Sequence, residues 1–290
     1  MSSFAFTLIL FSSIMHALYN LLIKRSRNKT VFIWWLFAIS SALFTLALPV
    51  LPGPFLRPDL TVVLLGAGGA FCFVLYHLLT GKAYRYGDIS VTYPLSQTAM
   101  LYLPLWGIWF FGEHLNLIGS FGIFMVAAGA YLLQMKRLGI SELLRPFGSL
   151  VDESVQAALA AGFAYSMGAV IDKTGVSSYP PLYFTYVLVL AMLGFMTANL
   201  LRPFHRPEIM AEWRKNYHLI LAGAPLMVGS FLSFRVGLSL SPMSYAIPVR
   251  QSGVLVGVLV GNMVLGEQCG SIRFLASLLI LAGVFLVRMG

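Results

Sequence analysis

Apolar runs of about 20 residues follow one another from the first residues of the chain to the last. A run of this length crosses the hydrocarbon core of a bilayer as a single helix. The chain is 59% hydrophobic and only 10% charged, a composition that excludes an ordinary soluble domain. We therefore expect an all-α integral membrane protein with ten transmembrane helices, at residues 4–23, 31–50, 60–80, 90–111, 116–135, 154–172, 181–201, 217–236, 243–265 and 271–288.

Two stretches of the chain repeat one another. Residues 83–133 align without a gap on residues 237–287, at a constant spacing of 154. We predict a first repeat at residues 1–135 with spans one to five, a linker at 136–153, and a second repeat at 154–290 with spans six to ten. A duplicated bundle of membrane helices is typical of a transporter whose site lies between the copies, near the middle of the bilayer.

The basic residues indicate how the chain crosses the membrane. Most of the 19 lysines and arginines lie in or next to the connections after the odd-numbered spans, whereas the other side has Arg57, Lys173 and Arg288. Basic loops stay in the cytoplasm, so we expect a multi-pass protein of the inner (plasma) membrane with both termini outside the cytoplasm. Equivalent loops of the two repeats have opposite charge bias, which predicts that the second repeat is inverted relative to the first.

The repeated motifs resemble a known family. The first copy has a hinge with Ala83, Arg85, Gly87 and Asp88, then Pro94 and Gln97, then Gly112, Glu113 and Gly129. The second copy keeps Pro248, Gln251, Gly266, Glu267 and Gly283 but has Ser241 and Pro242 in place of the Gly-Asp hinge. This pattern resembles the EamA domain of the drug/metabolite transporter superfamily, over essentially the whole chain. The resemblance implies ten helices around a central cavity and alternating access, but it does not fix the substrate.

Arg250 is the first candidate for substrate binding. It lies in span nine beside Gln251 and replaces Ser96 of the first copy. A charge inside the membrane is costly and marks a functional site by default, and a guanidinium binds carboxylate or phosphate through two hydrogen bonds. The alternative is an arginine whose head reaches a lipid headgroup. Arg235, in span eight, lies closer to the end of its span and fits either interpretation.

The repeated prolines predict bends in spans four and nine. Each proline leaves a carbonyl four residues earlier without its helical donor, so Pro94 and Pro248 are candidate hinges. Gln97 and Gln251 follow on the same helix face and are candidates to line the cavity, or else to bond a neighbouring helix.

Polar side chains cluster on other spans and predict a shared aqueous pocket. The cluster on span one is His16, Tyr19 and Asn20, that on span three is Tyr76 and His77, and span six has Tyr165. Tyr93 and Tyr245, beside the two prolines, complete the predicted substrate-binding set. Either His16 or His77 could bind a proton, although a structural histidine explains each one alone slightly better.

Missing residue types narrow the function. No Asp or Glu lies in the middle of a predicted span. A proton-coupled exporter of cationic drugs would need such a carboxylate to bind both the proton and the cation, so this function is not expected. The two cysteines predict neither a disulfide framework nor a metal site, and no nucleophile, phosphate-loop or metal motif indicates an enzyme or a cofactor.

We therefore expect a secondary active transporter of small organic metabolites that works by alternating access. Its substrate is expected to be anionic or zwitterionic: an amino acid, a carboxylate or a phosphonate-like compound. The alternative is a flippase for lipids or lipid headgroups. Beyond the substrate and the bilayer, the sequence is compatible with a coupled proton or counter-substrate and with a homodimer, and it indicates no nucleic-acid partner.

Overall fold

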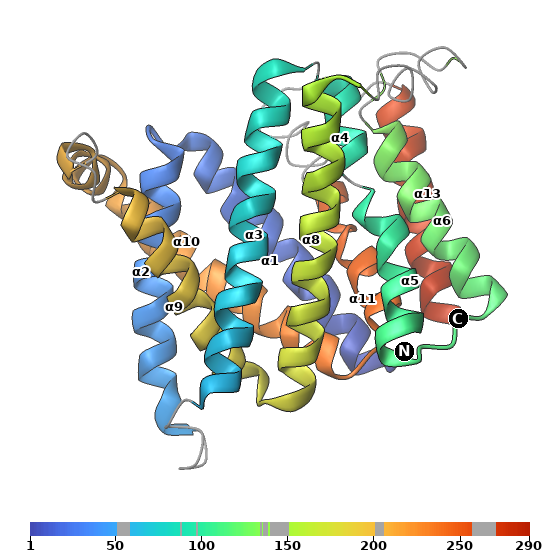
Figure 1. Ribbon diagram of the computed structural model, residues 1–290, viewed down its shortest axis with the longest axis horizontal. Coiled ribbons are helices and arrows are strands. Elements are labelled where there is room, and N and C mark those ends of the chain that lie inside the picture. Colours follow the sequence, from blue (N-terminus) through green and yellow to red (C-terminus); the bar gives the residue numbers. More distant parts are fainter. Residues whose placement is uncertain are drawn as a thin grey trace.

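All the secondary structure that the computed structural model describes is helical (Figure 1). The described residues are 1–50, 59–87, 89–96, 98–133, 135, 139, 151–200, 206–256 and 271–290, with the backbone alone at 89, 90, 93, 94, 199 and 206. The helices are α1 (Ser3–Arg25), α2 (Lys29–Ala47), α3 (Leu60–Tyr86), α4 (Ile89–Ser96), α5 (Ala99–Phe111), α6 (Leu117–Leu132), α8 (Glu153–Ser178), α9 (Pro181–Leu200), α10 (Arg206–Ser239), α11 (Met243–Arg250) and α13 (Ser271–Met289). The short 3-10 helix η1 (Leu48–Val50) follows α2.

Seven helices of the described chain are long and apolar enough to cross a membrane, which confirms a multi-pass, all-α architecture. They are α1, α2, α3, α8, α9, α10 and α13, and the shorter α5 and α6 are also apolar. A helix occupies each predicted span, but the fourth is divided between α4 and α5. The ninth begins with α11 and is described only as far as Val256.

Polar side chains define where several helices begin. Ser2, Asn28, Asp59 and Asn116 each precede a helix, and each side chain accepts a hydrogen bond from the amide three residues later. These bonds satisfy amides that the first turn of a helix leaves without partners. The sequence therefore marks the starts of α1, α2, α3 and α6 with short polar residues.

The helix α10 differs from the predicted span. It begins at Arg206 rather than near residue 217, and its backbone leaves helical geometry at Asn216. The side chain of Asn216 donates to Glu212 at 2.6 Å, and Glu212 also accepts the backbone amide of Asn28 at 2.9 Å. The basic connection before span eight is thus partly a helix, attached to the start of α2.

The packing follows a pseudo-twofold pattern between the repeats. At the spacing of 154, α3 corresponds to α10 and α6 to α13. α1 packs on α10, and the equivalent helices α8 and α3 pack on each other; likewise α2 contacts α10, and α9 contacts α3. Figure 1 shows α3 beside α8 and α6 beside α13. The two halves therefore interlock, and each half contributes helices to the centre.

Both central segments are interrupted at matched places. α4 ends at Ser96, two residues after Pro94, and α5 begins at Ala99. α11 ends at Arg250, two residues after Pro248, and Gln251 and Ser252 form turns before helical residues resume at Gly253. Interrupted membrane helices commonly present backbone and side chains to a substrate site.

Glu113 fixes the start of α11. Gly112 ends α5 in the left-handed conformation, with φ 61°, and this turns the chain so that Glu113 faces the second repeat. Its carboxylate accepts hydrogen bonds from the backbone amides of Met243 at 2.5 Å and Ser244 at 3.0 Å, and another from the Ser244 hydroxyl. Glu113 therefore caps α11, a helix in the other half of the molecule.

Candidate functional site

The interlocked helices enclose a cavity of about 580 Å³. A volume of this size is typical of sites for small organic molecules. Its walls come from both repeats and include both members of the divergent pair, Ser96 and Arg250. The two halves thus present a serine and an arginine, at equivalent positions, to one shared space.

Most of the predicted binding residues lie around this cavity. Those that line it are His16, Tyr19, Asn20, Tyr76, His77, Tyr165, Arg250 and Gln251. Tyr245 does not: its side chain is buried elsewhere, and its hydroxyl accepts the amide of Asn116 at 3.3 Å, where it braces the turn before α6. Gln97 and the side chains of Tyr93 and Pro94 lie outside the described residues, while Pro248 is buried within α11.

The guanidinium of Arg250 lies between an aromatic ring and a histidine. Its Cζ is 4.0 Å from the centre of the Phe234 ring, and its Nη2 is 3.5 Å from Nδ1 of His16. Among the described residues, no carboxylate forms an ion pair with it. An aromatic face attracts a cation only weakly compared with an anion, so the charge of Arg250 is left uncompensated.

His16 connects Arg250 to α1. The Tyr19 hydroxyl lies 2.6 Å from Nδ1 of His16, one turn away on the same helix. Tyr165 of α8 packs on Tyr76 and Phe73 of α3, with ring centres 5.8 Å (Phe73) and 5.3 Å (Tyr76) away. All three residues line the cavity, so part of its wall is aromatic and suits the apolar body of a ligand.

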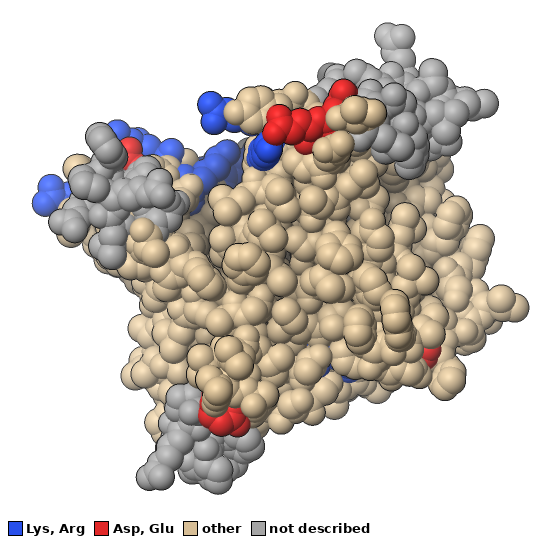
Figure 2. All heavy atoms as spheres, viewed as in Figure 1, with Lys and Arg blue, Asp and Glu red and all other residues tan. Residues whose placement is uncertain are grey.

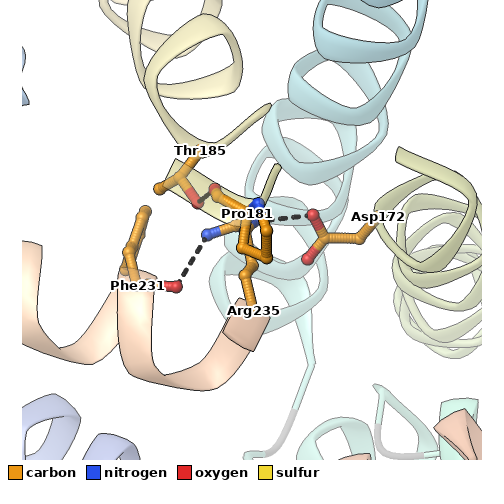
Figure 3. Close-up of polar contacts among 5 residues, drawn as sticks. All are labelled: Asp172, Pro181, Thr185, Phe231 and Arg235. Atoms are coloured by element: carbon orange, nitrogen blue, oxygen red, sulfur yellow. Dashed lines mark hydrogen bonds and ion pairs between the residues drawn. The ribbon is translucent and has the colours of Figure 1, made fainter. Parts of the chain in front are cut away.

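A buried ion pair also lines the cavity, and the sequence did not predict it. Nε of Arg235 on α10 lies 2.8 Å from Oδ1 of Asp172 on α8, and each side chain is only 4% exposed (Figure 3). The predicted span ends at residue 172, whereas α8 continues to Ser178 and places the carboxylate of Asp172 inside the bundle. Two opposite charges near the C-terminal ends of two apolar helices are the signal that could have revealed the pair.

The two ends of the cavity differ. At one end the lining reaches Lys24 and the exposed side chain of Asn20. Figure 2 shows basic side chains gathered around a notch at this upper side, above a broad uncharged belt. At the other end Nζ of Lys173 donates to the carbonyls of Leu238 at 2.8 Å and Ser241 at 2.9 Å, which ties α8 to the end of α10. The cavity is therefore accessible from the Lys24 side and closed beyond Arg235.

The charges of the lining favour an anion. Its described ionisable side chains, apart from histidine and tyrosine, are Lys24, Arg235 and Arg250 against Asp172 alone. Within the described residues, no group of three His, Cys, Asp or Glu side chains could hold a metal ion. The arrangement can hold an organic anion in an apolar, aromatic space.

Comparisons with known proteins agree with this architecture. A search of curated proteins finds no significant match. One solved structure, described only as a crystal structure of a protein, is similar over 99% of this chain and 96% of its own, with 17% identity and a TM-score of 0.71. At that identity the likeness shows the fold alone. The sequence model of the EamA-like transporter family matches residues 3–135 and 154–289, nearly the whole chain in two copies. The chain therefore belongs to the EamA-like transporter family.

Proposed function

We propose that this protein is a secondary transporter of small organic anions or zwitterions, and that Arg250 binds the acidic group of the substrate. The observation that carries the proposal is the guanidinium of Arg250, which faces the cavity without a carboxylate partner among the described residues. A cation in the wall of a largely apolar cavity is unfavourable without a paired anion, so an incoming carboxylate, phosphonate or phosphate gains both charge pairing and hydrogen bonds.

The cavity supports the same class of substrate by its shape. Its volume of about 580 Å³ suits a metabolite the size of an amino acid or somewhat larger. Tyr76, Tyr165 and Phe73 offer an apolar surface, whereas His16, Asn20 and Gln251 offer hydrogen-bonding groups. The substrate is thus expected to combine one acidic group with a compact organic body.

The proposed mechanism is alternating access between two inverted repeats of five spans each. Arg250 lies where α11 ends. The helix of the ninth span is interrupted at this point, and the helix of the fourth span is interrupted at the equivalent point, between α4 and α5. Interrupted segments can change direction while the rest of each helix stays rigid, with Pro94 and Pro248 as hinges. We place the protein in the inner membrane, with the Lys24 side in the cytoplasm.

A ligand screen tests the proposal directly. The purified full-length protein would be heated with amino acids, carboxylates, phosphonates, sugar phosphates and quaternary amines, because a ligand that binds the folded state raises the melting temperature. Acidic compounds should stabilise it. Arg250→Ala should weaken their binding about 30-fold or more, because truncating one member of a buried charge pair costs about 2–5 kcal/mol.

The matched control is Arg214→Ala, which removes the same charge from an exposed position in the polar first part of α10, away from the cavity. It should bind like the wild type. The best compound would then be loaded into proteoliposomes, where the wild type should move it and Arg250→Ala should not. Stabilisation by quaternary amines alone would contradict the anion assignment, and movement of labelled lipid without movement of any soluble compound would favour a flippase.

A further inference from the structure

The ion pair between Asp172 and Arg235 lies in the wall of the cavity rather than between helices away from it. Both residues line the cavity together with Arg250. Figure 3 shows Arg235 extending from α10 toward Asp172 on α8, with Phe231 one turn before it. The described space thus contains two guanidiniums and a single carboxylate.

The contact between the two residues does not use the full binding capacity of the guanidinium. Nε of Arg235 meets one carboxylate oxygen at 2.8 Å, and Nη1 donates to the carbonyl of Phe231 at 3.4 Å. A guanidinium can instead bind an acidic group through two parallel hydrogen bonds, which is the stronger arrangement. Asp172 therefore holds Arg235 through a single bond that a better-placed anion could replace.

We propose that Asp172 is a tethered counter-ion that occupies Arg235 in the empty transporter and that the transported anion displaces it. Arg235 then joins Arg250 in holding the acidic group of the substrate. This inference rests on the proposed function, since it needs an anion to enter the cavity. It adds a second binding residue and a competitor built into the chain.

Displacement of Asp172 also loosens the closed end of the cavity. The ion pair connects α8 to α10, and the neighbouring Lys173 connects α8 to the end of α10 at Leu238 and Ser241. Once a substrate occupies Arg235, the carboxylate of Asp172 must turn to water or to another cation. Binding of the anion would therefore remove one of the contacts that keep this end shut.

The test compares Asp172→Asn with the wild type in thermal-shift titrations of the full-length protein. The probes are acetate, which mimics the missing carboxylate, and inorganic phosphate, each exchanged for chloride at constant total anion. Asp172→Asn should melt lower than the wild type in chloride, because Arg235 loses its partner. Its melting temperature should then rise with acetate and phosphate by several degrees more than that of the wild type, because the probe takes the vacated place.

The matched control is Glu153→Gln on the same helix. Glu153 forms an exposed pair with Lys82 at 2.6 Å, outside the cavity. This variant loses the same charge and should respond to the probes like the wild type. An Asp172→Asn protein that responds no more than Glu153→Gln would overturn the proposal, because Asp172 would then not compete for an anion.

A double variant keeps the test decisive if Asp172→Asn does not fold in chloride. Extraction of the Asp172→Asn protein from the membrane in acetate should then recover it folded, because acetate takes the place of the missing carboxylate. The variant Asp172→Asn with Arg235→Gln removes both charges, and its response to the probes should fall below that of the wild type. A response equal to the wild type would show that Arg235 takes no part in binding.

Arg250→Ala separates this inference from the proposed function. If the wild type responds to the anions and Arg250→Ala does not, while both Asp172 variants behave like the wild type, then only the role of Asp172 and Arg235 fails. If neither the wild type nor any variant responds to an anion, the proposed function fails with it.

Discussion

Glu113 shows how one side chain can position the helix of Arg250, the proposed substrate-binding residue, from the other half of the chain. Its carboxylate meets the first amides of α11, where the positive end of the helix dipole favours a negative charge. Gly107 lies beneath it, and a Cβ at Gly107 would collide with the Glu113 carboxylate and the Ser244 hydroxyl. Because α11 ends at Arg250, the cap that fixes the start of this helix also fixes where Arg250 lies in the cavity wall.

We expect Glu113→Gln to destabilise the protein by about 1–2 kcal/mol, the usual cost of losing a helix cap. The side-chain amide has an NH2 group in place of one carboxylate oxygen, and this group donates rather than accepts, so the backbone amide of either Met243 or Ser244 loses its acceptor. Melting temperature in a single detergent measures the effect. The control is Asp152→Asn, since Asp152 precedes α8 without a capping hydrogen bond and its variant should melt like the wild type. Equal melting of Glu113→Gln and the wild type would contradict the role of the cap.

At the scale of single residues, the sequence predicted which isolated polar residues line the cavity, but it did not predict the ion pair. Arg250 and His16 stand out because each is polar within an apolar run, and both line the cavity. Asp172 and Arg235 are 63 positions apart, so their contact depends on how α8 and α10 pack, which no local pattern contains. Tyr245 shows the opposite error: it lies in the right helix, but its ring faces α6 rather than the cavity.

At the scale of helices, the repeated glycine has a clear physical role. Gly129 and its equivalent Gly283 lie where α6 packs on α13. A Cβ at Gly129 would lie 2.8 Å from the Ala276 carbonyl oxygen, and one at Gly283 would lie 2.7 Å from that of Gly122. The absence of side chains lets the two backbones approach closely, as small residues do in membrane helices.

We predict that Gly129→Ala lowers stability by about 1–3 kcal/mol, the typical cost of overpacking. Alanine is intrinsically the better helix residue, so any loss must come from packing against α13. Gly81→Ala is the matched control, because a Cβ at this helical glycine meets nothing within 4 Å. It should leave the melting temperature unchanged or raise it. A Gly129→Ala protein as stable as Gly81→Ala would show that the helices can separate without cost.

The positions of the helices could be predicted from hydropathy, whereas several of their ends could not. The apolar runs locate α1, α2 and α13 to within three residues at each end. α10 extends ten residues before Asn216 as a polar helix, and the contacts of Glu212 with Asn28 and Asn216 hold it. Hydropathy cannot detect a helix whose stability comes from a polar contact with another segment.

At the scale of the whole molecule, the described lining of the cavity reaches the surface at the Lys24 end. Lys24 and Asn20 mark the accessible end, while Lys173 and the pair of Asp172 with Arg235 close the other. An alternating-access transporter must exchange this state for one that faces the opposite way. Under the proposed mechanism, the contacts of Lys173 break during each cycle.

Labelling of an introduced cysteine can test this sidedness. In a background with Cys72→Ser and Cys269→Ser, Asn20→Cys should react with a membrane-impermeant maleimide from the Lys24 side of vesicles. Lys173→Met removes the bonds to Leu238 and Ser241, so it should increase labelling from the opposite side. Lys82→Met, at an exposed pair outside the cavity, should leave the pattern unchanged. Equal labelling of the parent from both sides would contradict a one-sided cavity.

The ion pair at the closed end has no counterpart in the first repeat. At the spacing of 154, Arg235 corresponds to Gly81, which has no side chain and cannot supply a charge. Opening the Arg235 end moves two charges into water, where dissolved ions screen them, but at the opposite end the described residues form no buried ion pair. Ionic strength should therefore act unequally on the two faces, and a saltier medium should favour the state that faces away from Lys24. A carrier made of two identical halves would lack this sensitivity.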